Sequence, residues 1–258
     1  MNPSDTRRFG GIERLYGEAA YAALRSARVC LVGLGGVGSW CAEALARSGV
    51  GAITLVDGDT VAESNINRQL PALESTIGQP KAQVLAQRFA QINPDGDFTA
   101  VAQFLDADNI ASILQGCHLV VDAIDSLQAK AALAAWAHRN DVPILVSGGA
   151  GGKTDPSAVT ADDLARTQGD ALLAKLRTVL RKQYGFPPGA SDPKKIRKFG
   201  IRAVFSTQPA QGSAVAHRGE EFSNFGTAMP VTAAVGLRLA AEAIALLTAP
   251  SASGVQNQ

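Results

Sequence analysis

Four short runs of branched apolar residues punctuate the first 150 positions of the chain. They are RVCLVG (28–33), AITLVD (52–57), HLVVDAID (118–125) and VPILVSGG (142–149). Each run is too short and too continuous to be an amphipathic helix, and such runs suit central parallel strands that are covered on both faces. The pattern therefore predicts the middle of a buried sheet.

Helical patterns separate these runs. The first is GSWCAEALARSG (38–49), and the second is PKAQVLAQRFAQIN (80–93), with Pro80 at a first-turn position. The third, SLQAKAALAAWAHRN (126–140), begins at Ser126, a candidate N-cap. Strand–helix alternation predicts right-handed crossovers. The expected fold class is therefore α/β, with a Rossmann-like, doubly wound, mostly parallel sheet and helices on both faces.

The remainder of the chain differs from the first 150 positions in its residue pattern. Residues 160–183 look helical, and residues 184–226 are rich in glycine, proline and charge, with a strand candidate at IRAVFST (201–207). Irregular segments of this kind often carry substrate contacts. A last helix is expected over about 228–248, with a frayed tail after it.

We expect one domain over residues 1–258, with a nucleotide-binding core at 1–152 and a substrate-facing excursion and C-terminal helix at 153–258. The 258 residues, 46% of them hydrophobic, suffice for one substantial core. Arg238 and Glu242 interrupt the longest apolar run, so we expect no stable membrane insertion. The polar N-terminus has no signal-peptide core, which favours a cytoplasmic protein.

Charge and cysteine content narrow the function classes. The formal net charge is +1, so no global field attracts nucleic acid or membranes, although a local patch can. Cys30, Cys41 and Cys117 are expected to be small buried hydrophobes. The sequence has no C-x-x-C pair, and therefore no zinc knuckle is visible.

A glycine-rich turn follows the first strand-like run. Gly33, Gly35 and Gly38 satisfy G-x-G-x-x-G, and Gly36 lies among them, with a strand before and a helix after. Such a turn lets the backbone approach phosphate oxygens at a helix N-terminus. Asp57 closes the second run, where a carboxylate can hold ribose hydroxyls. A redox dinucleotide and ATP fit these features equally well.

The segment after Asp57 favours ATP. The stretch DGDTVAESNINRQL (57–70) places Arg68 beyond the ribose strand, and Lys81 begins the next helical pattern. A pyrophosphate in a dinucleotide needs little side-chain charge, whereas a triphosphate that loses pyrophosphate needs cations and a metal. Asp125 ends the third run beside the same crevice and can bind Mg²⁺. The chain has no G-x-x-x-x-G-K-[ST], which excludes a P-loop ATPase.

Each of these residues has a plainer explanation when it is taken alone. Arg68 could be a surface salt-bridge partner, Lys81 a solvated residue at a helix start, and Asp125 a cap for the helix after it. The glycine turn could be a packing turn without a ligand. Their joint placement at strand ends around one turn favours the nucleotide site.

These segments carry a family resemblance. VGLGGVGS, LVDGDTVAESNINRQ, GQPKA, INP and VVDAIDS resemble the ubiquitin-activating-like adenylating enzymes, which include the molybdopterin- and thiamine-pathway adenylyltransferases. The resemblance implies that the glycine turn contacts ATP, that Asp57 holds the ribose and that Asp125 binds Mg²⁺. It places Asn67, Arg68 and Lys81 at the phosphates. Further members of the implied nucleotide-binding set are Asp59, Ser64, Asn65 and Ser126.

Other segments resemble one branch of that superfamily. RRFGGIERLYG (7–17), SGGAGGKTDP (147–156), VFSTQ (204–208) and the Phe-Gly pair in NFGTAMPVTA look like the tRNA threonylcarbamoyladenosine dehydratases, which cyclise t6A to ct6A at position 37 of tRNA. The resemblance implies adenylation of the t6A carboxylate. The glycine run GGAGG could also be a flexible hinge.

The sequence lacks cysteines that related enzymes carry. Sulfur-carrier activators usually have two C-x-x-C zinc pairs and often a reactive cysteine, and this chain has neither. Dehydratases can carry a cysteine shortly before the last Phe-Gly pair, where this chain reads RGEEFSNFG. We therefore expect no covalent thioester intermediate.

The resemblance also implies partners. An N-terminal arginine of one subunit reaches the ATP of the other in the superfamily, which implies a homodimer, with Arg14 as first candidate and Arg8 as second. Two solvated arginines are the plainer explanation. The implied substrate is tRNA that carries t6A37, and a sulfur-relay protein is a further candidate partner.

A basic run is the candidate tRNA surface. Residues 175–202 contain nine cations and one acid, Asp192. Phosphate contacts would need such a cluster, although charge runs are often solvated faces. The cations at the centre of the run are Lys194, Lys195, Arg197 and Lys198. Tyr184 and Phe186 could stack on an anticodon-loop base, or pack in the core.

Three other functions stay open on sequence alone. An adenylyltransferase could activate the C-terminus of a ubiquitin-like sulfur carrier, but the zinc and cysteine set is missing. An NAD(P)-binding redox protein would leave Arg68 and Lys81 without a role. A nonenzymatic nucleotide sensor would bind ATP without turnover.

Overall fold

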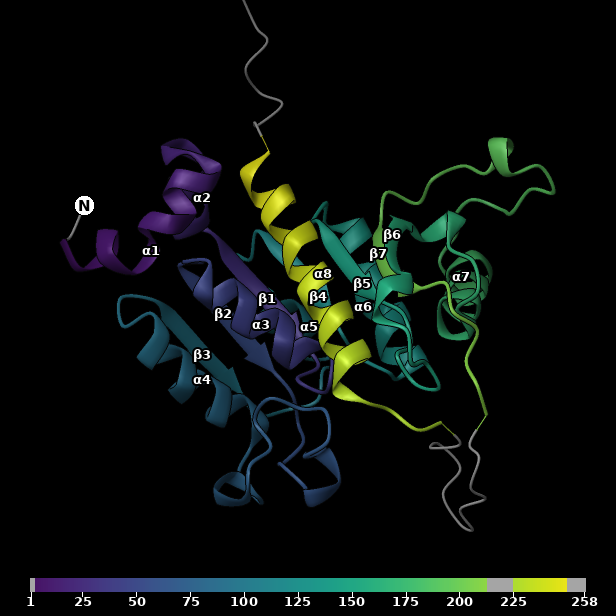
Figure 1. Ribbon diagram of the computed structural model, residues 1–258. Helices are drawn as coiled ribbons and strands as arrows, with labels where there is room; N and C mark the ends of the chain where they lie inside the picture. Colours follow the sequence, from purple (N-terminus) through teal and green to yellow (C-terminus); the bar gives the residue numbers. More distant parts are fainter. Residues whose placement is uncertain (1–2, 213–224, 250–258) are drawn as a thin grey trace, which may run out of the picture.

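A seven-stranded sheet organises the computed structural model, which describes residues 3–212 and 225–249 (Figure 1). Within these residues the strand order is β3-β2-β1-β4-β5-β7-β6, and only β6 runs antiparallel to its neighbour. The strands are β1 (Arg28–Val32), β2 (Ala52–Val56), β3 (Asp97–Val101), β4 (Leu119–Asp122), β5 (Ile144–Ser147), β6 (Val159–Asp163) and β7 (Arg202–Ser206).

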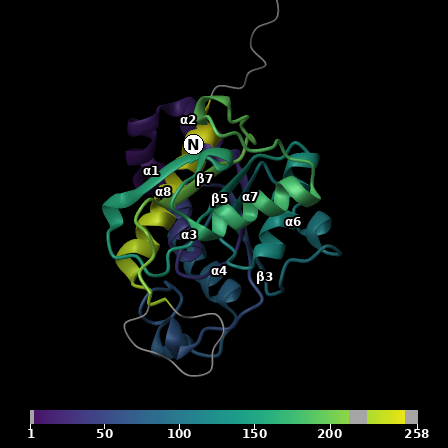
Figure 2. The ribbon, with the colours of Figure 1, turned by 90° about the vertical axis from the view of Figure 1, so that its right-hand side faces the viewer.

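Helices cover both faces of this sheet (Figure 2). One face packs against α3 (Gly38–Arg47), α4 (Lys81–Ile92) and α8 (Met229–Thr248), and the other against α6 (Leu127–Arg139) and α7 (Ala171–Gln183). The remaining α-helices are α1 (Pro3–Tyr16), α2 (Glu18–Ser26) and the short α5 (Ile110–Ile113). The expected Rossmann-like, doubly wound class is therefore confirmed.

The central strands are apolar on both faces because both faces are covered. In β1, Leu31 packs with α3, α4 and α8, whereas Cys30 and Val32 pack with α6 and α7. All three side chains are at most 3% exposed. Truncating one such residue to alanine costs about 2–5 kcal/mol in other proteins. This burial explains why the sequence shows continuous apolar runs here rather than alternation.

The sequence pattern did not predict two strands of the sheet, β6 and β3. Residues 160–183 were expected to be helical, but residues 159–163 form β6, and the helix α7 starts only at Ala171. The edge strand β3 was not expected at all. Both are edge strands with partly exposed residues, so neither shows an apolar run. The expected tail at 250–258 and the stretch 213–224 lie outside the described residues.

The strand order creates one crevice. The chain leaves β1 towards β2 and β3 on one side, and continues from β4 towards β5 on the other, so the order reverses between β1 and β4. Ligands bind in such sheets outside the carboxyl ends of the strands at this reversal. We call the side where β1, β2, β4, β5 and β7 end the carboxyl edge, and the opposite side the amino edge.

One helix in the described part of the chain is long and apolar enough to cross a membrane by length and composition. It is α8, and half of its most apolar window is buried inside the protein. Its packing on α3 is close, since a Cβ added at Gly236 would lie 2.4 Å from the backbone oxygen of Val37. The helix therefore serves as a core element of this fold.

Candidate active site at the carboxyl edge

The glycines of the turn after β1 differ in how closely other atoms approach them. A Cβ at Gly33 would lie 2.7 Å from backbone atoms of Ala123, and one at Gly38 would lie 1.8 Å from the oxygen of Gly33. These two allow β1, β4 and α3 to pack closely. Gly35 is more open, and the nearest atom to its added Cβ is Nε2 of Gln69 at 3.9 Å. No side chain caps the N-terminus of α3, and the amide of Ser39 already donates to the oxygen of Gly35. The amides of residues 35–38 have no partner in the described part of the chain and are available to an anion.

Asp57 ties the end of β2 to this turn. Its Oδ2 accepts a hydrogen bond from the amide of Leu34 at 2.6 Å, and its Oδ1 accepts one from the amide of Asp59 at 2.8 Å. A carboxylate has about four acceptor positions. The side chain therefore shapes the turn and keeps acceptor capacity for ribose hydroxyls.

Arg68 lies directly over the glycine turn. A Cβ added at Gly36 would lie 3.2 Å from Cγ of Arg68. The indole nitrogen of Trp40 donates to the backbone oxygen of Arg68 at 2.9 Å, which docks this segment on α3. The guanidinium donates to the oxygen of Ser64 and to Oδ1 of Asn67. The structure thus brings together two features that the sequence separates by about 30 positions.

The two asparagines of this segment shape it in different ways. Asn65 is buried, and its Oδ1 accepts from the amide of Ala62, so it stabilises the local turn. Asn67 is exposed, and its Nδ2 donates to the oxygen of Thr227 at 2.8 Å. Asn67 therefore connects the candidate phosphate segment to the start of α8.

Lys81 is a buried cation rather than a solvated one. Its side chain is only 5% exposed, and its ammonium lies 2.8 Å from Oδ2 of Asp59. The side chain of Asp59 is half exposed, and its carboxylate has no other partner among the described residues. The plain explanation of Lys81 as a surface residue is wrong, because a buried lysine needs a partner or a ligand.

Asp125 and Ser126 are exposed just beyond the carboxyl end of β4. Ser126 occupies the N-cap position of α6, but no side chain caps this helix. Neither side chain makes a hydrogen bond in the described part of the chain. The carboxylate of Asp125 is therefore not used as a helix cap, and it is exposed three residues after the end of β4, next to the crevice.

A fully buried ion pair lies beneath Asp125, and sequence reasoning missed it. Asp122 ends β4, and its Oδ1 lies 2.9 Å from the ammonium of Lys130 on α6, with both side chains 0% exposed. The same oxygen accepts a hydrogen bond from the amide of Ile124. Burial raises the pKa of Asp122, and the ammonium opposes this shift. The pair fixes the backbone that leads to Asp125.

The branch-specific segments meet at the carboxyl ends of β5 and β7. Lys153 of the GGAGGK segment is buried, 3.1 Å from Oδ2 of Asp170, and it also donates to the oxygen of Ser206. Asp170 accepts from the amide of Gly149 as well. The amide of Gly152 donates to the oxygen of Gly226 in the Phe-Gly pair. The glycine run is fastened at both ends, which contradicts a free hinge.

Gln208 of VFSTQ completes this arrangement. Its Oε1 accepts hydrogen bonds from the amides of Thr154 and Asp155, both at 2.9 Å. Its Nε2 donates to the hydroxyl of Thr154. Three of the four segments that pointed to one enzyme branch therefore form one hydrogen-bonded wall beside the crevice, and the fourth, residues 7–17, lies at the amino edge.

Two further residues lie beside the nucleotide turn, and of these Phe104 was not expected. Phe104 is 68% exposed, and its ring would be 2.7 Å from a Cβ added at Gly58, next to Asp57. Gln69 is buried, and its Oε1 has no partner among the described residues. An exposed aromatic ring beside the ribose carboxylate suits an adenine face. In the sequence, Phe104 is an isolated aromatic in a polar loop.

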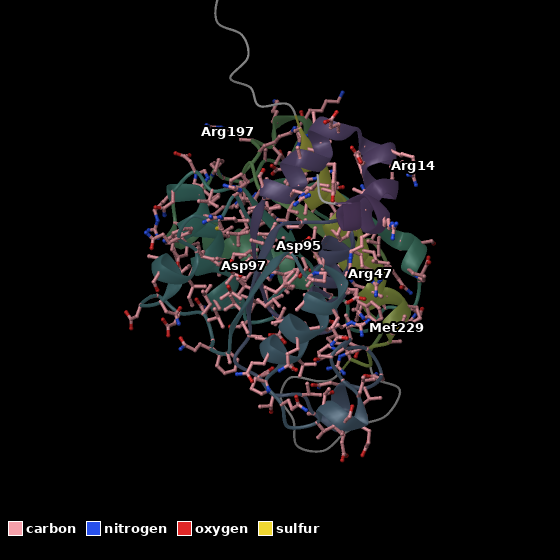
Figure 3. The ribbon with its side chains drawn as sticks, turned by 90° about the vertical axis from the view of Figure 1, so that its left-hand side faces the viewer. Arg14, Arg47, Asp95, Asp97, Arg197 and Met229 are labelled. Carbon is pink, nitrogen blue, oxygen red and sulfur yellow. The ribbon has the colours of Figure 1, made fainter. Side chains whose placement is uncertain are left out.

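The N-terminal arginines lie away from this crevice. Arg8 donates to the backbone oxygen of Ile92 at 3.2 Å, and Phe9 packs on Tyr21, close to Gly49 before β2. The middle of α1 is therefore at the amino edge. Arg14 is exposed and projects from the outer surface of α1 (Figure 3).

The cysteines are poor nucleophiles. Cys30 and Cys41 are fully buried as expected, and burial raises the pKa of both thiols. Cys117 is only partly buried, and its pKa is also raised by burial. A thiolate is the reactive form. The described residues therefore offer no activated thiol, while the RGEEFSN stretch (218–224) lies outside them.

Comparison with known proteins gives a consistent result. A family model described as the ThiF family matches residues 11–258. The tRNA threonylcarbamoyladenosine dehydratase of Haemophilus influenzae is 45% identical, with 89% of each chain covered. The enzyme of that name from Escherichia coli is 43% identical over 95% of each chain. The Escherichia coli molybdopterin-synthase adenylyltransferase is 40% identical over 50% of this chain.

Solved structures agree with these sequence matches. The crystal structure of the Escherichia coli dehydratase in complex with ATP has a TM-score of 0.87 and 42% identity, and 96% of each chain is covered. The complex of the same enzyme with AMP has a TM-score of 0.86.

Proposed function

This chain belongs to the ThiF family and to its tRNA threonylcarbamoyladenosine dehydratases, and from that premise we infer that it is an ATP-dependent enzyme that cyclises t6A to ct6A at position 37 of tRNA. The structural observation that carries this function is Arg68 over Gly36, beside the uncapped N-terminus of α3. A cation and free amides around one turn suit a triphosphate better than a dinucleotide.

The reaction is a dehydration coupled to ATP cleavage. The carboxylate of the threonyl group attacks the α-phosphorus, and pyrophosphate leaves. A ureido nitrogen or oxygen then attacks the activated carbonyl and expels AMP, which carries away the carboxylate oxygen. No general base is needed for the first attack because a carboxylate is ionised near pH 7.

The residues of this chain position the reactants and offset charge. Asp57 accepts ribose hydroxyls, and the glycine turn with Arg68 holds the phosphates. Lys81 adds a second cation, which its pairing with Asp59 keeps at the edge of the crevice. Prealigned groups of this kind stabilise developing charge at low reorganisation cost.

The donor set at Asp125 fits a magnesium ion that arrives with the nucleotide. No group of three or more His, Cys, Asp or Glu side chains in the described part of the chain could form an all-protein metal cage. Mg²⁺ is usually held by one or two carboxylates together with substrate phosphates. When bound, the ion neutralises phosphate charge, and Asp125 is the residue that would hold it.

Mass spectrometry of position-37 nucleosides tests the function. Incubating t6A-containing tRNA with protein, ATP and Mg²⁺ should convert t6A to a product lighter by one water, with one AMP released per cyclised nucleoside. An unchanged nucleoside, combined with AMP transfer to a sulfur-carrier C-terminus, would favour the adenylyltransferase function instead. Calorimetry with NAD and NADP should show no binding.

We also propose a homodimer with a shared site. Arg8 and Arg14 lie on α1 at the amino edge, so in one protomer they are remote from the glycine turn. The exposed face of α8 carries the apolar side chain of Leu237, which is 52% exposed. A second copy of the chain would cover this face and bring an arginine of its α1 to the other crevice.

Mixing two inactive variants tests the shared site. Arg14→Ala and Asp125→Ala should each lose activity, because each removes a different contribution to one site. A randomly exchanged equimolar mixture should recover about a quarter of the wild-type rate, since half the dimers are heterodimers with one complete site each. The experiment is repeated with Arg8→Ala. No recovery with either arginine variant, despite proven subunit exchange, would contradict the shared site.

The four central cations of the basic run form the proposed tRNA surface. Lys194, Lys195, Arg197 and Lys198 are exposed, and their side chains have no bonding partners in the described residues. They lie at the amino edge, so they would hold the body of the tRNA rather than the reacting nucleotide. Phe186 is instead a core residue, packed between His138 and Phe199, and does not stack on RNA.

Replacing these four cations by alanine should weaken tRNA binding and leave ATP binding unchanged. Binding to phosphates releases counterions, so the salt dependence of the tRNA dissociation constant should flatten by about one unit per lost contact. We expect a higher KM for tRNA with little change in kcat. Calorimetry with ATP is the control. Wild-type affinity and salt dependence would show that the run is solvated surface.

A further inference from the structure

A cavity of about 430 Å³ lies at the amino edge, beyond the end of β6. One of its walls is the short helix at Pro193–Lys195, a segment that is seen at the upper right of Figure 1. The lining residues are Asp162, Arg166, Gln168, Pro193, Lys194 and Ile196. It is separate from the nucleotide crevice, because β6 runs antiparallel and ends at the opposite edge of the sheet.

Arg166 is the distinctive residue of this cavity. Its Nε atom is buried and has no hydrogen-bond partner in the described part of the chain. The guanidinium makes no ion pair there either. Buried polar groups in native proteins are normally paired, and the guanidinium that lines this cavity has no such partner among the described residues. A guanidinium presents a planar fork of donors that matches carboxylates and phosphates.

The walls of the cavity are fixed relative to one another by Asp163. Its Oδ1 accepts from the amide of Ala165, which caps the turn that carries Arg166. The two oxygens also accept from the amides of Phe199 and Gly200, just after the basic turn. All of these bonds are 2.9 Å long. The cavity is thus a prearranged feature rather than a gap between loose segments.

The charges around the cavity favour an anion. Arg166 and Lys194 supply two positive charges, and Asp162 supplies one negative charge, one oxygen of which accepts from the adjacent amide. Lys194 also begins the exposed row of cations that forms the proposed tRNA surface. The cavity therefore opens where that surface would meet an RNA backbone.

We propose that this cavity seats one backbone phosphate of the tRNA, with the fork of Arg166 on its non-bridging oxygens and Lys194 beside it. The proposal rests on the proposed function for its source of phosphate. The cavity would add one fixed phosphate-binding site, called here the anchor, to a surface of exposed cations. A seated phosphate would set the register of the tRNA on the protein, whereas exposed lysines alone would only attract it.

Filter binding of t6A-containing tRNA across a salt series tests this anchor. Arg166→Gln should lower the affinity about 5–10-fold near 0.1 M salt and reduce the salt slope by about one unit, as expected for one lost phosphate contact. Asp162→Asn should do the opposite and tighten binding, since it removes the only carboxylate lining the cavity. The matched control is Arg139→Gln, an exposed arginine of α6 that does not line the cavity, and it should bind as wild type.

A lower tRNA affinity for Arg166→Gln together with a higher tRNA affinity for Asp162→Asn cannot arise from a general loss of folding. Wild-type tRNA affinity in Arg166→Gln would overturn the proposal. If calorimetry then shows inorganic phosphate binding to wild type but not to Arg166→Gln, the cavity serves a free anion instead. Nucleoside conversion by the wild-type enzyme is measured separately, so failure of this anchor is distinguishable from failure of the proposed function.

Discussion

Replacing Arg68 by alanine should lower the rate of t6A cyclisation about 10²–10³-fold, the usual loss when one prealigned charge-stabilising group is removed. The reason is its position, with Cγ 3.2 Å from a Cβ added at Gly36, over the turn that holds the phosphates. The charge it offsets grows as pyrophosphate leaves. The loss should therefore appear in kcat more than in the affinity for ATP.

Single-turnover conversion of t6A, followed by nucleoside mass spectrometry, measures this effect. Arg68→Lys keeps the charge but not the fork, and should fall between wild type and Arg68→Ala. Arg139→Ala, a distant exposed arginine, is the matched control and should keep the wild-type rate. A rate for Arg68→Ala within a few-fold of wild type would mean that Lys81 and the amides of α3 hold the phosphates alone.

The sequence was sufficient for the parts of the site that depend on local pattern. The strand–turn–helix around Gly33–Gly38 and the acid at the end of β2 follow from short-range rules, and the structure places them together. The parallel direction of the central strands follows from strand–helix alternation with right-handed crossovers, whereas the edge strands β3 and β6 were not predicted. The carboxyl edge of the sheet was thus predictable as the location of the site.

Contacts between distant segments were not predictable in this way. Nothing local indicates that Lys153 pairs with Asp170 or that Gln208 binds the backbone after it, because these partners meet only once β5 and β7 are adjacent. Phe186 was ambiguous for the same reason. Its burial depends on Phe199 and His138, which come from other segments. The family resemblance indicated that these segments belong together, but not how they touch.

The buried pair of Asp122 and Lys130 was equally hidden, since an acid at a strand end and a lysine in a helix usually face solvent. Both side chains are 0% exposed here, and the pair supports the backbone between β4 and Asp125. Lys130→Met should therefore reduce the free energy of unfolding by about 3–5 kcal/mol, because it leaves a buried charge without compensation. Urea denaturation monitored by circular dichroism measures this loss.

The pH dependence of that variant separates an uncompensated charge from a packing defect. Burial already raises the pKa of Asp122, and removing the ammonium takes away the main group that opposes the shift. A carboxyl group whose pKa is raised on folding binds protons more tightly in the folded state, so its destabilising effect shrinks as the pH falls towards its unfolded pKa of about 3.9. The deficit of Lys130→Met relative to wild type should therefore be smaller at acidic than at neutral pH.

Asp122→Asn combined with Lys130→Met provides the decisive comparison. Asparagine keeps an oxygen that can accept from the amide of Ile124 but carries no charge, so the double variant should recover much of the lost stability. Lys175→Met, at an exposed position on α7, is the matched control and should change stability by about 0.5 kcal/mol or less. A double variant as unstable as Lys130→Met, with a pH-independent deficit, would show that Lys130 acts through packing alone. Recovery of stability without recovery of cyclisation would indicate that the ionic pair also positions Asp125.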